Sequence, residues 1–200
     1  MGFLSVLGMA HKLAGDRLSP GDTAVDATCG NGNDTLFLAE QIGPRGRVYA
    51  FDIQEQALRR TKERFASALP RERLPELCLI HGSHAGMAMH IAEDSRKRLG
   101  AVMFNLGFLP GPEADTSIIT KTASTLAALD ASLGLLRPGG ILTIVLYPGH
   151  PGGDQEAAAV EQWASSLPQG AGQAVLYRMP QKPASPFLLA VEKKSIQTKD

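Results

Sequence analysis

The chain has 200 residues, 44% of them hydrophobic and 20% charged, which suits one folded domain with a full apolar core. Its 20 basic and 20 acidic residues cancel, so net charge provides no bulk attraction to nucleic acid or to an anionic membrane. No apolar run approaches the roughly 20 residues of a membrane span, and residues 1–18 predict an amphipathic N-terminal helix rather than a signal peptide. We therefore expect a cytoplasmic protein in which Cys29 and Cys78, which lack metal-site spacing, are reduced.

Helix-like and strand-like segments alternate along the chain. We expect helices at residues 3–14, 34–41, 54–68, 87–92, 121–136 and 154–166, and strands at 23–27, 47–51, 76–81, 100–105, 141–147, 174–179 and 187–192. The alternation predicts a mostly parallel sheet covered on both faces, whereas the short 181–186 loop predicts an antiparallel hairpin at the end. The sequence thus predicts one α/β domain over residues 1–200. It is Rossmann-like, with seven strands and an antiparallel last strand, as in class I methyltransferases.

A glycine turn follows the first expected strand, in the run Gly30-Asn31-Gly32-Asn33-Asp34-Thr35. Asp52 ends the next strand. This combination is typical of proteins that bind an adenine nucleoside, because the turn lets backbone approach the ligand and the acid accepts hydrogen bonds from ribose hydroxyls. The nucleoside belongs either to NAD or to S-adenosylmethionine (SAM).

Two features of the turn favour SAM. Thr35 stands where a dinucleotide-binding turn has its third glycine, and Asp34 would repel a phosphate. SAM has no phosphate and carries a sulfonium and an ammonium group, so Asp26, Asp34 and Asp52 around one pocket would suit it. The simpler interpretation, in which Asp34 only caps a helix and the glycines only make a turn, explains Asp52 less well.

Polar residues also follow the second and third strands. Gln54 is placed to contact the adenosine, or is merely a first-turn helix residue. Ser83 and His84 follow the third strand and are expected near the adenine ring, although Ser83 would also serve as a helix cap. His81 and His84 have a spacing that a metal would need to complete with His90 or His150, and we expect no metal site.

The catalytic residues are expected at the ends of the fourth and fifth strands. Asn105 ends an apolar strand and precedes a turn with Phe108, and it would accept hydrogen bonds from an amine that attacks the SAM methyl. Phe108 would pack on a flat base. Tyr147 and His150 would line the substrate mouth, with His150 as a base or as a structural loop residue.

Basic residues form two runs whose ordinary role is a solvated helix face. They would suit an RNA backbone if they lay beside the mouth. These residues are Arg59, Arg60, Lys62, Arg64, Arg71 and Arg73 in the first run, and Arg96, Lys97 and Arg98 in the second.

Six motifs in this order resemble one family. They are residues 26–35 and 51–57, His81-Gly82-Ser83-His84, residues 104–111, Gly149-His150-Pro151 and Pro186-Phe187. Together they resemble the small bacterial class I methyltransferases first labelled rRNA methylases, now associated with methylating the 5-aminomethyl group of wobble (2-thio)uridine in tRNA. By this resemblance, SAM would be held by Asn31, Asn33, Asp34, Asp52, Gln54, Ser83 and His84.

The resemblance is weakest in the substrate loop, where Phe108 replaces a tyrosine and Pro112-Glu113-Ala114 replaces Gly-Asp-Lys. The leading hypothesis is a SAM-dependent tRNA amine methyltransferase, which would need neither membrane nor metal; a homodimer is left open. One alternative keeps SAM but takes rRNA or a small-molecule amine as acceptor. Alternatives of another class are an NAD-dependent oxidoreductase and a non-catalytic nucleoside-binding module.

Overall fold

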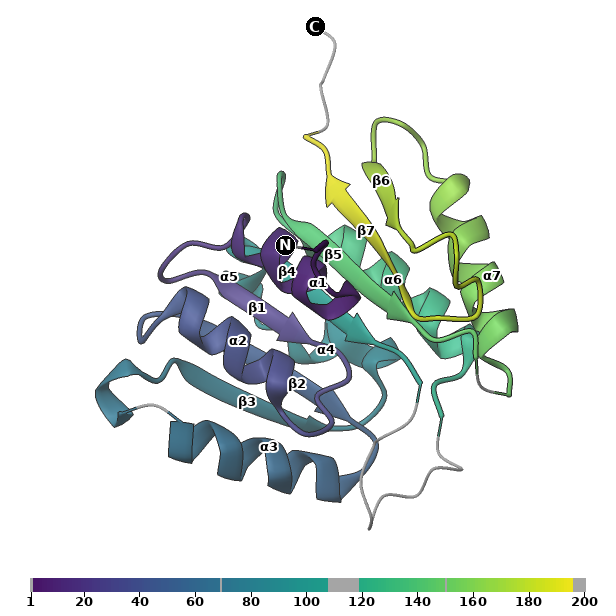
Figure 1. Cartoon of the computed structure of the whole chain (residues 1–200). Helices are drawn as coiled ribbons and strands as arrows, with labels where there is room; N and C mark the ends of the chain where they lie inside the picture. Colours follow the sequence, from purple (N-terminus) through teal and green to yellow (C-terminus); the bar gives the residue numbers. More distant parts are fainter. Residues whose placement is uncertain (1, 69, 108–118, 150, 196–200) are drawn as a thin grey trace, which may run out of the picture.

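Seven strands form one sheet in the computed structural model, which describes residues 2–68, 70–107, 119–149 and 151–195 (Figure 1). The strand order is β3-β2-β1-β4-β5-β7-β6. The strands are β1 (Thr23–Asp26), β2 (Arg47–Asp52), β3 (Glu76–His81), β4 (Leu99–Asn105), β5 (Ile141–Leu146), β6 (Gly172–Tyr177) and β7 (Phe187–Lys193). β7 lies antiparallel between β5 and β6, and the other pairs are parallel, so the predicted fold is confirmed.

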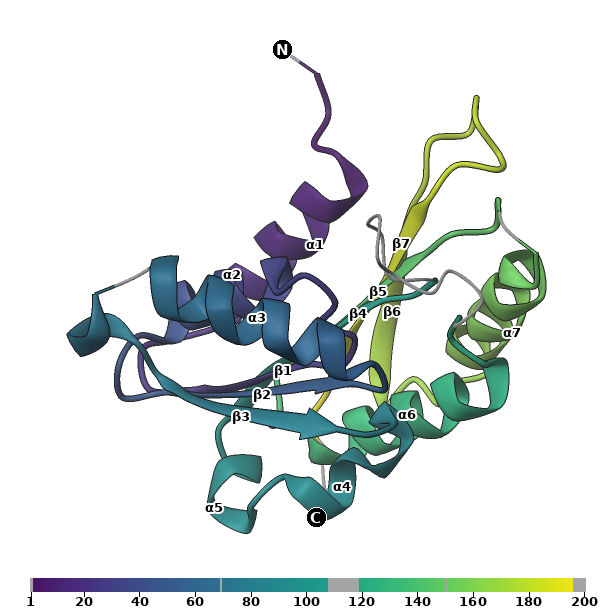
Figure 2. The ribbon, with the colours of Figure 1, turned by 90° about the horizontal axis from the view of Figure 1, so that it is seen from below.

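Helices cover both faces of the sheet. Figure 2 shows α1, α2 and α3 on one face and α4 to α7 on the other. Their bounds are α1 (Val6–Gly15), α2 (Asn33–Ile42), α3 (Glu55–Ala68), α4 (Met87–His90), α5 (Glu93–Arg96), α6 (Thr122–Leu135) and α7 (Gly153–Ser165). Two 3-10 turns complete the described elements, η1 (Arg71–Arg73) and η2 (His84–Gly86).

The helix expected at residues 87–92 differs most from the prediction. The structure has two single-turn helices, α4 and α5, separated by Ile91 and Ala92 in extended conformation. The Ile91 side chain is buried in the main core cluster. The chain therefore leaves the helix to place this apolar residue inside, and the polar residues Glu93–Arg96 that follow form the second helical turn.

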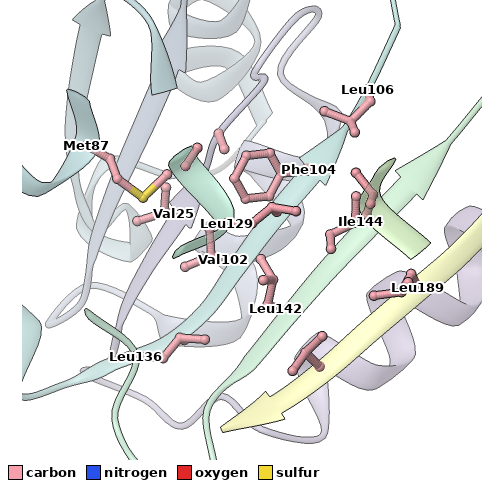
Figure 3. Packing of buried hydrophobic residues seen from close by; sticks show 14 of the residues in the cluster. Val25, Met87, Val102, Phe104, Leu106, Leu129, Leu136, Leu142, Ile144 and Leu189 are labelled. Carbon is pink, nitrogen blue, oxygen red and sulfur yellow. The ribbon is translucent and has the colours of Figure 1, made fainter. Parts of the chain in front are cut away.

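Two apolar layers hold the sheet to its helices. On the α4–α7 side the larger side chains of the strands, among them Phe104, Leu142 and Ile144, pack against Met87 and Leu129 (Figure 3). On the α1–α2 side the strands present many small side chains. Ala101 of β4 and Ala190 of β7 share one buried cluster with Ala10 and Ala14 of α1 there, which allows this N-terminal helix to lie close to the sheet.

Candidate active site

A cavity of about 510 Å³ opens at the edge where the parallel strands β1 to β5 end. This edge of an open α/β sheet is the usual place for a ligand. Ten of the residues predicted from the sequence lie in its lining: Gly30, Asn31, Asn33, Asp34, Asp52, Gln54, Ser83, His84, Asn105 and Tyr147. Phe108 and His150 lie outside the described residues, so their roles stay predictions.

The glycine turn approaches α3 too closely for a side chain. Gly32 has a φ of 78°, and a Cβ there would lie 2.9 Å from the Cα of Thr61. From α3, the Thr61 hydroxyl donates to the Gly30 carbonyl at 3.2 Å, and Nε of Arg64 donates to the Asn31 carbonyl at 2.7 Å. These contacts with α3 therefore fix the backbone of the glycine turn where it borders the cavity.

Several predicted basic residues serve the fold instead of forming a free charged face. Arg60 donates to Oδ1 of Asn31 at 3.1 Å, beside the Arg64 contact. Arg96 donates to the Ile91 and Ala88 carbonyls, and Arg98 donates to the Gly21 carbonyl. Arg64, Arg96 and Arg98 thus bind backbone carbonyls and Arg60 binds a side chain of the glycine turn, roles that the sequence pattern alone did not indicate.

Asp52 joins the end of β2 to the glycine turn. One carboxylate oxygen accepts a hydrogen bond from the Gly30 amide at 3.0 Å, and the other accepts from the Gln54 amide at 2.9 Å. Burial raises the pKa of Asp52, and these backbone donors oppose the shift. The carboxylate is thus fixed in orientation where it faces the cavity.

Asp34 lies in the first turn of α2 but does not cap the helix. The N-cap residue is Gly32, and Asp34 is bonded instead to Nε2 of His11 on α1, at 2.6 Å from its Oδ1. Asp34 is only 7% exposed and lines the cavity. His11 was not among the predicted residues, because its contact with Asp34 depends on how α1 packs.

Asp26 is the one described residue of the predicted set that does not reach the lining. It is 1% exposed at the end of β1, where it accepts hydrogen bonds from the Thr35 hydroxyl at 2.6 Å and the Thr28 amide at 3.2 Å. Burial, and next the charge of Asp34, raise the pKa of Asp26 to about 8. The expected direct contact with a cofactor is therefore replaced by a role in supporting the turn.

Ser83 and His84 follow β3 and both line the cavity. The Ser83 hydroxyl accepts from the Ala85 amide and caps η2, and its contact with the adenosine stays a prediction. Nδ1 of His84 contacts the Ala27 carbonyl at 3.2 Å, which assigns the ring proton to Nδ1. Burial lowers the pKa of His84, so the ring is neutral at pH 7.

Asn105 ends β4 and Tyr147 follows β5, and both line the cavity. The backbone amide of Asn105 donates to the Thr28 hydroxyl at 2.8 Å, which aligns β4 with β1. Burial and the charge of Asp34 raise the pKa of Tyr147, and a hydrogen bond with the Asn105 side chain opposes the shift. A neutral phenol and a carboxamide, both able to donate and accept, therefore lie next to each other.

The chain on either side of the 108–118 segment is tied together by Thr120. Its amide donates to the Gly107 carbonyl at 3.1 Å, and its hydroxyl accepts from the Gly107 amide at 3.2 Å. The same hydroxyl donates to buried Glu156 of α7 at 2.6 Å, and Glu156 also accepts from Thr125 at 2.7 Å. Thr120, Lys121 and Ser124 also line the cavity. The sequence did not indicate them as site residues, because Lys121 and Ser124 fall in the expected helix at 121–136 and Thr120 directly precedes it.

No helix in the described ranges is long and apolar enough to cross a membrane. No group of three or more His, Cys, Asp or Glu side chains that would suit a metal ion occurs in the part of the chain that the structure describes.

Comparison with known proteins agrees with this geometry. The family model described as "Putative rRNA methylase" matches residues 48–192, and a general methyltransferase-domain model matches residues 18–71. The chain is 38% identical over 191 residues to the chloroplastic tRNA (mnm5s2U34)-methyltransferase of Arabidopsis thaliana, covering 93% of this chain and 68% of the relative.

Solved structures give the same result. A protein from Clostridium thermocellum, described as a "putative rRNA-methylase", shares 36% identity with this chain. The TM-score is 0.87, and the match covers 96% of this chain and 100% of that one. A protein from Streptococcus mutans, described as a methyltransferase and solved with S-adenosylhomocysteine (SAH), shares 33% identity. The TM-score is 0.81, and the match covers 96% of this chain and 99% of that one. The chain therefore belongs to the rRNA-methylase family of SAM-dependent class I methyltransferases.

Proposed function

We propose that this enzyme transfers a methyl group from SAM to the 5-aminomethyl group of wobble (2-thio)uridine in tRNA. The observation that carries the proposal is that Asn105 and Tyr147 line the same cavity as Asp34 and Asp52. The relationship to the Arabidopsis tRNA (mnm5s2U34)-methyltransferase supports this choice of acceptor.

The cavity suits a cationic nucleoside cofactor. When bound, SAM supplies a methyl group that is electrophilic because it is attached to a sulfonium. Asp52, held by the Gly30 and Gln54 amides, would accept hydrogen bonds from the ribose hydroxyls. Asp34 would pair with the ammonium of the amino-acid end, and the glycine turn would admit the cofactor to close contact with backbone.

The acceptor side requires a neutral amine held in line with the methyl group. The amine nitrogen uses its lone pair to form the new C–N bond, the electrons of the broken C–S bond stay on sulfur, and the methylated nitrogen then loses a proton. The Asn105 side chain would accept an N–H of the amine, and the Tyr147 hydroxyl would orient it as donor or acceptor. Phe108 stacking on the base and His150 taking the proton are proposed with them.

The decisive experiment is mass spectrometry of tRNA nucleosides from a strain that lacks this chain. Accumulation of 5-aminomethyl-2-thiouridine, reversed when the gene is restored, is the expected result. An unchanged tRNA profile would exclude this acceptor. A thermal-shift assay adds a cofactor control, because SAM should raise the melting temperature and NAD should not.

The second candidate keeps SAM and takes rRNA or a small amine as acceptor, and the unchanged tRNA profile would favour it. The hypotheses of an NAD-dependent oxidoreductase and of a non-catalytic binding module are not supported, because the chain belongs to a methyltransferase family. We infer a cytoplasmic enzyme, and size-exclusion chromatography with light scattering would test the homodimer left open above.

A further inference from the structure

His11, on the N-terminal helix α1, contacts Asp34 in the lining of the cavity. His11 lies on α1, which packs against the sheet and against α2. Its Nε2 lies 2.6 Å from Oδ1 of Asp34, and its ring is stacked on Phe37 with centroids 4.0 Å apart and an interplanar angle of 4°. Asp34 and Phe37 are three residues apart on α2, so both contacts involve one face of this helix near its start.

The His11 contact decides how the Asp34 carboxylate is presented. Asp34 is nearly buried, and its charge acts on two neighbours, since it contributes to the raised pKa values of Asp26 and Tyr147. A buried carboxylate beside other acids needs a hydrogen-bond donor to keep one orientation. Nε2 of His11 provides such a donor, and the stacking on Phe37 fixes the plane of the ring.

We propose that His11 is a positioning residue, which holds the Asp34 carboxylate for the ammonium group at the amino-acid end of SAM. This inference rests on the proposed SAM site and adds α1 to it. His11 acts through Asp34, because it does not belong to the cavity lining formed by the described residues. The effect should therefore be confined to ligands that carry the amino-acid end.

Two ligands separate this role from a purely structural one. S-adenosylhomocysteine (SAH) has the amino-acid end, whereas 5′-methylthioadenosine has the same adenosine without it. Calorimetric titration of both ligands is made with the wild type, His11→Ala, His11→Gln and Lys12→Ala. Lys12 is the matched control, because it follows His11 on α1 but pairs with Asp16 at the surface.

We expect His11→Ala to weaken SAH binding about tenfold or more and to change methylthioadenosine binding less than twofold. His11→Gln should recover most of the SAH affinity, because its amide can donate to Asp34, and Lys12→Ala should match the wild type. Equal losses for both ligands, or unchanged SAH affinity in His11→Ala, would overturn the proposal. A wild type that binds neither ligand would instead refute the SAM site itself, and the positioning role with it.

A double-mutant cycle tests whether His11 acts through Asp34. Asp34→Asn should weaken SAH binding on its own, and combining it with His11→Ala should add little further loss, because both changes remove the same contact. Additive losses in the double variant would show that His11 acts by another route and would contradict the proposal.

Discussion

The Thr35 hydroxyl donates a 2.6 Å hydrogen bond to the Asp26 carboxylate inside the protein. Thr35 stands where dinucleotide-binding turns have their third glycine, which there allows close helix–strand packing beneath a pyrophosphate. In this chain the same position supplies a donor to a buried acid at the end of β1. Thr35 therefore replaces the glycine of the dinucleotide pattern with a hydrogen-bond donor, and its bond to Asp26 connects α2 to β1 below the glycine turn.

Asp26→Asn should change how stability depends on pH. The folded-state pKa of Asp26 is raised to about 8 from an ordinary 3.8, so between these values the folded state keeps a proton that the unfolded state has lost. The Asp26 contribution to stability is thus lost as pH rises through this range, at up to about 1.4 kcal/mol per pH unit. Asparagine does not titrate, and it can accept from Thr28 and donate to Thr35. Urea unfolding at pH 5 and pH 8 should show a smaller pH dependence in the variant; an unchanged dependence would contradict the shift.

Gly32→Ala should damage the cofactor turn more than its conformation alone explains. The residue has a positive φ, and its added Cβ would meet the backbone of Thr61 at 2.9 Å. Gly152→Ala is the matched control, since Gly152 is also a helix N-cap in left-handed conformation, with a φ of 81°, but an added Cβ there meets only the Ile119 side chain at 3.9 Å. We expect Gly152→Ala to cost about 1 kcal/mol, and Gly32→Ala to cost more and to abolish the SAM-induced rise in melting temperature. Equal effects would show that the close approach to α3 is unimportant.

Asp52→Ala should remove SAM binding while the sheet stays folded. The substitution deletes the proposed ribose acceptor and the two backbone contacts that connect β2 to the turn. Loss of two charge-assisted hydrogen bonds predicts at least about 100-fold weaker binding by calorimetry. Asp16→Ala, at an exposed acid on the N-terminal side of the chain, is the control and should bind normally. Micromolar affinity retained in Asp52→Ala would exclude the ribose role.

Asn105→Ala should separate catalysis from cofactor binding. The backbone amide of Asn105, which the substitution keeps, makes the contact with Thr28, so the end of β4 should hold its place. Loss of the side chain should leave SAM affinity within about twofold and slow single-turnover methyl transfer by about 100-fold. Unchanged turnover would remove Asn105 from the amine site.

Glu156→Ala should weaken the contacts of Thr120 with Gly107, the residues on either side of the 108–118 segment. The carboxylate is buried and accepts hydrogen bonds from Thr120 and Thr125, and Thr120 also bonds to Gly107. Leaving these hydroxyls without an acceptor should cost about 1–3 kcal/mol of stability and raise KM for tRNA more than Kd for SAM. Gln155→Ala, at the exposed neighbour on α7, should do neither. A stable Glu156→Ala variant with normal KM would show that the Thr120 contact does not support the site.

The sequence predicted those features that depend on neighbours along the chain. The alternation of strand and helix periods, together with the short 181–186 loop, predicted the parallel sheet with an antiparallel end strand. The placement of the glycine turn and Asp52 after two successive strands was sufficient to bring them to one cavity, because parallel strands end at the same edge. Local patterns failed at residues 87–92, where burial of Ile91 outweighed helix propensity.

Tertiary structure decided which charges and hydroxyls meet. His11 reaches Asp34 only because alanines on α1 and the sheet let the helix lie close, and Glu156 reaches Thr120 only because α7 packs beside the start of α6. Burial likewise separated three similar aspartates, placing Asp34 and Asp52 in the lining and Asp26 beneath it. The sequence determined by itself the fold and the glycine turn with its acids. The partner and solvent exposure of each acid depend on packing between distant segments, which no local pattern encodes.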